Sequence, residues 1–142
     1  MGYRTTADKL KAVGLREGFR SGLEEKIAAQ LDALNVPYSY ETIKIKYFKP
    51  VTYHTYTPDF GLPNGIIIET KGRFTSEDRK KHLAVKDQHP ELDIRFVFSN
   101  SKARLNKKSK TTYADWCQTH GFLFADKRIP EEWINEFPIH NS

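Results

Sequence analysis

Hydrophobic and polar positions repeat with two different periods along this chain of 142 residues, and each period predicts an element. Apolar residues recur every three or four positions from Leu23 to Leu34, which predicts a helix over residues 21–34. Ser21 and Glu24 open it with the Ser-x-x-Glu pattern of a capped N-terminus. Capping alone explains Glu24, so the pattern leaves open whether that carboxylate also has a catalytic role.

Strand-like alternation follows the helix. Residues 38–47 alternate apolar and polar side chains and predict a strand, followed by a connection around Pro50, where proline interrupts strand pairing. Residues 57–72 then carry two short apolar runs on either side of a Pro-Asn-Gly turn, which predicts a β-hairpin. We expect Gly65 at the last loop position, where hairpins with a three-residue loop need a left-handed residue.

The loop length decides which charged groups of this hairpin meet. Side chains at i and i+2 of a strand share a face, so Glu69 and Lys71 point one way and Thr70 the other. A two-residue loop places Asp59 opposite Thr70, on the wrong face. A three-residue loop over 63–65 places Asp59 opposite Glu69, with the Cβ atoms about 5–6 Å apart. We therefore predict the three-residue loop.

The second half of the chain alternates helix and strand. The sequence predicts a helix over 76–88, a strand over 93–99, a helix over 112–120 stopped by a glycine, a strand over 122–125 and a last helical turn from Pro130. This order of elements predicts a mixed α/β fold with a central mixed β-sheet flanked by helices.

One domain accounts for the whole chain. No internal repeat and no long linker divides it, so residues 21–142 are expected to form a single domain. Residues 1–20 are polar, basic and poor in large apolar groups, which predicts a flexible arm that orders on a negatively charged partner.

The net charge of the chain indicates the class of molecule that it binds. The chain has 23 Lys and Arg against 18 Asp and Glu, a net charge of +5, which favours polyanions. A single basic cluster is typical of a solvated surface, but three clusters around one acidic site indicate a phosphate backbone. The residues expected to contact DNA are Arg16, Arg20, Arg73, Arg79, Lys80, Lys102, Arg104, Lys107 and Lys108.

Several classes of function are excluded or disfavoured. A single cysteine, Cys117, excludes an internal disulfide and a zinc finger. The five histidines lack the spacing of a zinc site, and structural or surface roles are expected for all of them. No apolar run is long enough to span a membrane and the first residues have no hydrophobic signal core, so a cytoplasmic protein is expected. No small-molecule cofactor is expected.

The acids of the hairpin are the strongest candidate chemistry. Two carboxylates about 4 Å apart repel by about 4 kcal/mol at an effective dielectric of about 20, so Asp59 and Glu69 need compensating charge. Lys71 can neutralise one of them, and Mg²⁺ or Mn²⁺ accepts carboxylate and carbonyl oxygens. A structural alternative remains, in which Glu69 pairs with Lys71 at a strand end and Asp59 only shapes a turn.

At this point the chain resembles the phage endonuclease I family, the Holliday-junction resolvases of T-seven-like podophages within the restriction-endonuclease-like nucleases. The resemblance extends from about residue 19 to residue 134. The motifs that carry it are Phe19-Arg20-Ser21-Gly22-Leu23-Glu24, His54-Thr55-Tyr56-Thr57-Pro58-Asp59-Phe60, Leu62-Pro63-Asn64-Gly65-Ile66, Glu69-Thr70-Lys71-Gly72, Asp78-Arg79-Lys80-Lys81-His82-Leu83, His89-Pro90-Glu91-Leu92-Asp93-Ile94-Arg95, Phe124-Ala125-Asp126-Lys127, Ile129-Pro130 and Glu132-Trp133-Ile134.

The resemblance implies a restriction-endonuclease-like core and a catalytic set of Glu24, Asp59, Glu69 and Lys71. It implies two divalent ions, Mg²⁺ or Mn²⁺. Asp59 would bridge the ions, Glu69 and the main-chain carbonyl of Thr70 would hold one, and Glu24 would hold the other. Lys71 would orient or deprotonate the attacking water. The same scheme places the capping serine, Ser21, beside the site as a further DNA contact.

The resemblance also implies a domain-swapped homodimer. Residues 21–48 would be exchanged with a partner chain, and residues 49–53 would form the bridge between the protomers. Each active site would then take Glu24 from one chain and Asp59 from the other. A two-fold dimer suits a DNA junction with two symmetric strands.

The function that the resemblance implies is hydrolysis of phosphodiesters in four-way and other branched DNA, and we expect it to leave a 5′-phosphate and a 3′-hydroxyl. Phosphate contacts carry no sequence information, so weak sequence preference and strong salt dependence are expected. Two alternatives stay open: a DNA-binding module whose acids serve only folding, and a restriction-type or mismatch-nicking nuclease with the same chemistry.

Overall fold

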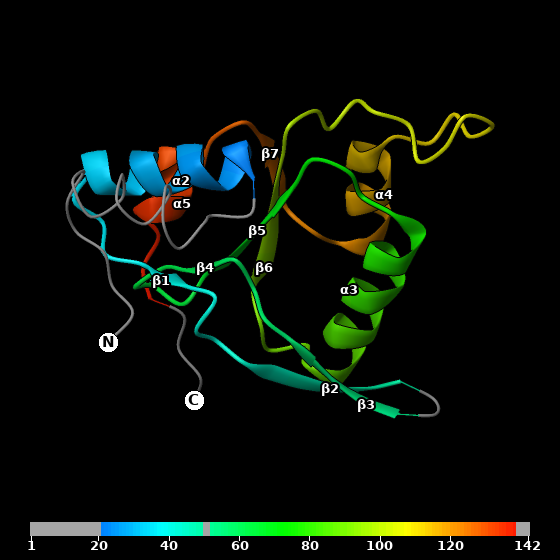
Figure 1. Cartoon of the computed structure of the whole chain (residues 1–142), viewed down its shortest axis with the longest axis horizontal. Coiled ribbons are helices and arrows are strands. Elements are labelled where there is room, and N and C mark those ends of the chain that lie inside the picture. Colours follow the sequence, from blue (N-terminus) through cyan, green and yellow to red (C-terminus); the bar gives the residue numbers. More distant parts are fainter. Residues whose placement is uncertain (1–20, 50–51, 139–142) are drawn as a thin grey trace.

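A mixed sheet of five strands forms the centre of the computed structural model, which describes residues 21–49 and 52–138 (Figure 1). The strand order is β1-β4-β5-β6-β7, with antiparallel pairing from β1 to β5 and parallel pairing from β5 to β7. The strand bounds are Ser39–Tyr40 for β1, Phe60–Gly61 for β4, Ile67–Lys71 for β5, Ile94–Phe98 for β6 and Phe124–Asp126 for β7.

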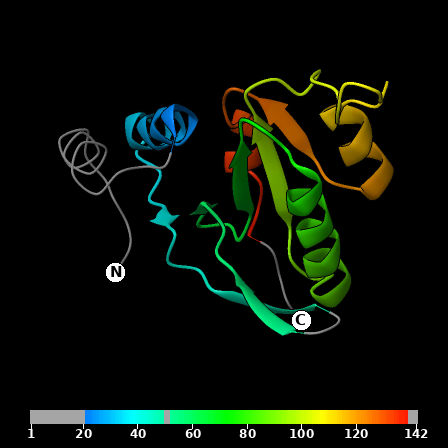
Figure 2. The same cartoon turned by 45° about the vertical axis from the view of Figure 1, so that its right-hand side comes forward.

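Helices cover both faces of this sheet (Figure 2). On one face lie α2 (Gly22–Ala33) and the short α5 (Glu131–Ile134), and on the other lie α3 (Ser76–Gln88) and α4 (Tyr113–His120). The predicted mixed α/β fold is therefore confirmed. The predicted arm at residues 1–20 lies outside the described residues. No helix in the described ranges is both long and apolar enough to cross a membrane.

The alternation of side chains along β5 divides the apolar interior into two layers. Ile66 and Ile68 pack with the α2 and α5 residues, whereas Ile67 packs with the α3 and α4 residues. On β6 the same division sends Val97 to the first layer and Phe96 to the second. The predicted faces of the hairpin strand are confirmed, and Glu69 and Lys71 accordingly lie on the α3 side of β5.

The turn between β4 and β5 has the predicted three-residue loop. Phe60 pairs with Ile68, the Leu62 amide donates to the Ile66 carbonyl at 2.9 Å, and Gly65 has a left-handed φ of 93°. Extended by one residue, this register places Asp59 opposite Glu69, as the loop length predicted.

Two predictions around residues 38–53 were wrong. The single strand predicted over residues 38–47 is divided by a left-handed residue, Glu41 (φ 53°), into β1 and β2 (Ile45–Lys49). An unpredicted strand, β3 (Thr52–Tyr56), begins at the end of the predicted connection and pairs with β2 in a separate two-stranded sheet, up to Lys49 opposite Thr52. Proline disturbs a ladder only where its missing N–H is needed, and Pro50 belongs to the undescribed residues 50–51 between the two strands.

A buried arginine ties the C-terminal segment to the sheet. The Arg95 guanidinium on β6 donates to Asp93 Oδ1 at 2.8 Å and to Glu136 Oε1 at 2.9 Å. The Asn64 side-chain amide donates to the Trp133 carbonyl at 2.8 Å. These bonds join α5 to the hairpin turn and to β6.

Replacing Arg95 by methionine is expected to lower the free energy of unfolding by about 2–4 kcal/mol, because both carboxylates lose their cation. Asp93 and Glu136 are partly exposed and can regain water, which limits the loss. Urea unfolding midpoints measure the change, with Arg128→Met, at an exposed arginine, as the control. Equal midpoint shifts in both variants would contradict the role of this clamp.

Candidate active site

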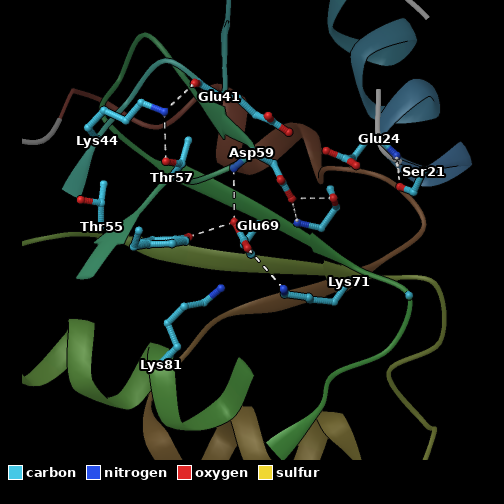
Figure 3. Close-up of a pocket in the computed structure, with 13 residues that line it drawn as sticks. Ser21, Glu24, Glu41, Lys44, Thr55, Thr57, Asp59, Glu69, Lys71 and Lys81 are labelled. Atoms are coloured by element: carbon cyan, nitrogen blue, oxygen red, sulfur yellow. Dashed lines mark hydrogen bonds and ion pairs between the residues drawn. The ribbon is translucent and has the colours of Figure 1, made fainter. Parts of the chain in front are cut away.

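An open pocket of about 450 Å³ lies beside the C-terminal end of β5 (Figure 3). Residues of α2, of the β1–β2 connection, of β3 and β5, and of α3 meet in it. Its lining residues are Ser21, Glu24, Glu41, Lys44, Thr55, Tyr56, Thr57, Asp59, Glu69, Thr70, Lys71, Gly72 and Lys81. The four residues predicted from sequence to carry the chemistry are all among them.

Three carboxylates converge in this pocket. Glu24, Glu41 and Asp59 each place one oxygen within 4.8 Å of the others, and Figure 3 shows the three side chains directed toward one another. Glu24 is buried at the start of α2, where its backbone amide donates to Ser21 Oγ at 3.1 Å and its carboxylate accepts from the Tyr40 hydroxyl at 2.8 Å. Ser21 is confirmed as the N-cap, but the reciprocal half of the capping box is absent, because the Glu24 carboxylate accepts from Tyr40 and faces the pocket instead of the Ser21 amide.

The Asp59 carboxylate takes a different direction from the one expected. Its Oδ2 accepts from the backbone amide of Thr70 at 2.9 Å and from the Thr70 hydroxyl at 2.8 Å. Asp59 meets Glu69 through its backbone amide, which donates to Glu69 Oε1 at 3.2 Å. Asp59 precedes the first residue of β4, so the pleat of the ladder does not set its side-chain direction.

Glu69 is held in a buried environment on the α3 side. The Tyr56 hydroxyl donates to Glu69 Oε1 at 2.9 Å, Lys71 Nζ lies 3.5 Å from Oε2, and His82 Nε2 lies 3.8 Å from Oε2. Burial raises the pKa of Glu69, but interactions with His82, Lys71 and Tyr56 outweigh it and hold that pKa below its usual value. Glu69 is therefore ionised.

His82 was not recognised from the sequence as part of this site. It is fully buried, and neither ring nitrogen has a hydrogen-bond partner at bonding distance among the described residues. Its ring packs in T-shaped arrangements against the rings of Tyr56 and Phe96. Burial lowers the pKa of His82 despite the opposing effect of Glu69, so the imidazole is neutral and borders the Glu69 carboxylate.

The pKa of Asp59 is shifted in the opposite direction from the pKa of Glu69. Burial, then the charges of Glu69 and Glu24, raise the pKa of Asp59 to about 8, although both hydrogen bonds from Thr70 oppose the shift. In the ranges that the structure describes, no Lys or Arg lies within 4.0 Å of a Glu24 or Asp59 carboxylate oxygen. Lys44 Nζ instead contacts the Glu41 carbonyl and the Thr57 hydroxyl. Hard oxygen donors at this spacing fit a Mg²⁺ or Mn²⁺ ion.

Lys71 lies between two carboxylates. Its Nζ is 3.5 Å from Glu69 Oε2 and 3.2 Å from Asp78 Oδ1. Burial lowers the pKa of Lys71, but Glu69 and Asp78 outweigh it and raise that pKa above its usual value. The side chain is therefore an ammonium, which suits orienting an anion or a water better than removing a proton.

The residues predicted to contact DNA differ in where they lie and in whether they are exposed. Ser21 lines the pocket. One guanidinium nitrogen of Arg79 donates a hydrogen bond to the Phe74 carbonyl at 2.6 Å. Arg16 and Arg20 lie outside the described residues. The exposed members are Arg73, Lys80, Lys102, Arg104, Lys107 and Lys108. The last four belong to the loop after β6, which begins next to the site, where the Ser99 amide donates to the Lys71 carbonyl at 3.1 Å.

Sequence reasoning missed several residues of the site besides His82: Glu41, Lys44, Tyr56, Asp78 and Lys81. One signal was present, because Asp78 and His82 stand four residues apart in the predicted helix and so share a face, together with Lys81. Glu41 had no such signal, since its position depends on the pairing of β1 with β4.

Comparison with known proteins agrees with the motifs in this site. A sequence model of the phage endonuclease I family matches residues 1–141. The chain is 55% identical over 127 residues to "Endonuclease I" of Escherichia phage T7, covering 88% of this chain and 85% of that protein. It is 56% identical over 118 residues to "Endodeoxyribonuclease 1" of Enterobacteria phage T3, covering 83% of this chain and 78% of that protein. The chain therefore belongs to the phage endonuclease I family.

Proposed function

We propose that this protein is a divalent-metal-dependent endodeoxyribonuclease that cuts four-way junctions and other branched DNA. The observation that carries the proposal is the convergence of Glu24, Glu41 and Asp59 within 4.8 Å, beside buried Glu69 and the Lys71 ammonium. This set of groups fits phosphodiester hydrolysis. The names of the T7 and T3 relatives support DNA as the substrate class.

Glu24, Glu41 and Asp59 would hold Mg²⁺ or Mn²⁺, with Glu69 and the Thr70 carbonyl as further donors. The Thr70 amide faces Asp59, whereas the Lys71 carbonyl faces Ser99 on the β6 side. Carbonyls alternate in direction along a strand, so the Thr70 carbonyl is directed to the Asp59 side. A bound ion of this kind supplies Lewis-acid charge and lowers the pKa of water.

Lys71 supplies the fixed positive charge that the hydrolysis needs at the pocket. Its ammonium is held at the end of β5 and can orient the scissile phosphate or stabilise the charge that develops on it. The Tyr56 hydroxyl, which donates to Glu69 Oε1, holds the neighbouring Glu69 carboxylate in one orientation. The buried side of the site is thus preorganised before DNA binds.

The basic loop after β6 provides a surface for the DNA arms. Lys102, Arg104, Lys107 and Lys108 are exposed on the segment that starts beside Lys71. Phosphate contacts by such residues release counterions, so binding should weaken steeply with added salt and depend little on sequence. Selectivity for branched DNA then comes from the shape of the basic surface.

The proposal includes a homodimer in which residues 21–48 are exchanged across a bridge at residues 49–53. Within one chain, Glu24 on α2 already reaches Asp59 next to β4. Exchange of identical segments would build the same contacts from two chains, giving two sites related by a two-fold axis. Two such sites match the two symmetric strands of a junction.

Cleavage of a four-way junction beside a linear duplex with the same arm sequences tests the function. In Mg²⁺ the junction should be cut faster than the duplex, leaving 5′-phosphate and 3′-hydroxyl ends, and EDTA should stop the reaction. Equal rates on both substrates would favour a restriction-type or nicking nuclease. Binding without cleavage in Mg²⁺ or Mn²⁺ would favour a DNA-binding module.

Glu41→Gln tests the unpredicted acid of the cluster. Removing its charge is expected to lower the affinity for Mn²⁺ by about 10- to 100-fold, the scale on which a supporting or ligating group acts at a metal site. Calorimetric titration of the folded protein with Mn²⁺ measures this affinity. Glu25→Gln is the matched control, because Glu25 is exposed on the same helix turn as Glu24. Unchanged affinity in Glu41→Gln would remove Glu41 from the ion site.

A further inference from the structure

Lys71 is held from two sides, by two elements that are distant in sequence. Glu69 lies two residues before it on β5, and Asp78 reaches it from the first turn of α3, with Asp78 Oδ1 3.2 Å from Lys71 Nζ. The contact to Asp78 is the shorter of the two. The lysine side chain is only 15% exposed, so both carboxylates act on an ammonium that is largely shielded from water.

Asp78 is fixed in place by its role as a helix cap. Its Oδ2 accepts from the Thr75 backbone amide at 3.2 Å, and its own amide donates to Thr75 Oγ1 at 3.1 Å, which completes a capping box. One carboxylate oxygen therefore serves the helix, and the other faces Lys71. The cap gives the ion pair a rigid base on the helix side.

The other charged groups around Lys71 make Asp78 hard to replace. Glu69 and Asp59 face it from the sheet side. From α3, Lys81 approaches the same Asp78 oxygen at 4.0 Å, and neutral His82 borders Glu69. Without Asp78, α3 would present a lysine and a neutral ring to Lys71, and nothing on that side would hold the ammonium.

We propose that Asp78 is a positioning residue for the reaction, which fixes the Lys71 ammonium beside Glu69 and couples the start of α3 to the active site. This inference rests on the proposed nuclease function. It assigns to a capping residue a second task that depends on its charge. Asparagine at this position can still accept the capping hydrogen bond, so Asp78→Asn removes the ion pair with little change to the helix start.

The chain contains a matched control in α4. Asp115 forms the same capping box with Thr112, at 3.0 Å for both hydrogen bonds, and among the described residues no lysine or arginine forms an ion pair with it. Asp115→Asn therefore makes the same chemical change at a helix start whose capping residues do not line the pocket. A loss that arises only from weaker capping should be equal in both variants.

Cleavage kinetics on a four-way junction give the first measurement. Asp78→Asn is expected to lower kcat by about 10- to 100-fold, because small displacements of a positioned group have effects of this size, while KM stays close to wild type. Asp115→Asn should keep the wild-type kcat. Thr75→Ala, which weakens the cap but leaves the Asp78 charge, should also keep most of kcat. Equal losses in Asp78→Asn and Asp115→Asn, or a full loss in Thr75→Ala, would overturn the inference.

A second measurement needs neither DNA nor metal. The order parameter of the Lys71 Cε group, from NMR relaxation of ¹³C-labelled lysine assigned with Lys71→Arg, should fall in Asp78→Asn and stay unchanged in Asp115→Asn. Unchanged order in Asp78→Asn would refute the positioning role even if cleavage declines. Absence of cleavage by the wild-type protein would instead refute the proposed function, and the order parameter would still decide the inference.

Discussion

Asp59→Asn is expected to abolish DNA cleavage and, at the same time, to stabilise the metal-free protein at neutral pH. Asp59 belongs to the acid cluster with Glu24 and Glu41, and its amide also contacts Glu69. Losing its charge should lower kcat by at least about 10²–10³-fold, the scale for removing one preorganised electrostatic group. Junction binding in EDTA should persist, because the basic surface is unchanged.

The gain in stability follows from the proton that Asp59 binds in the folded protein. Its pKa is raised by burial, Glu69 and Glu24 to about 8, against an ordinary value of 3.8. Between these two values the folded chain keeps a proton that the unfolded chain releases, so wild-type stability declines as pH rises through this range. Asparagine carries no charge and avoids this decline, which corresponds to about 1–3 kcal/mol at pH 8 and almost nothing at pH 4.

Thermal unfolding in EDTA at pH 5 and pH 8 checks this expectation. Asp59→Asn should melt at a higher temperature than wild type at pH 8, with a smaller difference at pH 5. Mg²⁺ should raise the melting temperature of wild type at pH 8 but not that of the variant, because a ligand stabilises only the state that binds it. Asp87→Asn, at an exposed position on α3, is the control. A stability difference that does not depend on pH would show that the raised pKa is wrong, and persistent cleavage would remove Asp59 from the catalytic set.

The parts of the site that could be predicted from sequence are those determined by neighbouring residues. The helix start at Ser21, the left-handed Gly65 and the register of Asp59 against Glu69 all follow from capping and turn chemistry within a few positions. The bounds of α3, Ser76–Gln88, agree with the prediction for the same reason. Local rules therefore located three of the four predicted catalytic residues on the correct elements.

The remaining parts depend on contacts between distant segments. Glu41 enters the site because it adopts φ 53° and its amide donates to the Asp59 carbonyl at 3.2 Å, and a non-glycine residue rarely takes that conformation. The direction of the Asp59 carboxylate depends on two donors from Thr70 beyond the end of the ladder. His82 meets Glu69 only through the packing of α3 against β5. Periodicity in one segment carries no information about such contacts.

A mixture of Glu24→Gln and Asp59→Asn protomers is expected to recover cleavage that neither variant has alone. In the proposed exchanged dimer, each site takes Glu24 from one chain and Asp59 from the other. A heterodimer of the two variants then has one site with both acids and one site with neither. Random pairing after co-refolding makes half of the dimers heterodimers, so about a quarter of all sites should be intact.

A second mixture of variants tests whether recovered cleavage depends on the exchange of residues 21–48 between chains. Asp59 and Glu69 both follow the bridge, so in a mixture of Asp59→Asn and Glu69→Gln protomers every site lacks one acid and no cleavage should return. Glu24 and Asp59 of one chain are also close enough to share a site. If each site is built within one chain in this way, neither mixture should recover cleavage. The products give an independent check. A dimer with one working site should nick a single strand of a junction, whereas a trace of wild-type dimer would cut both strands. If cleavage returns only in the first mixture, and its products are only single-strand nicks, then Glu24 and Asp59 must act from different chains.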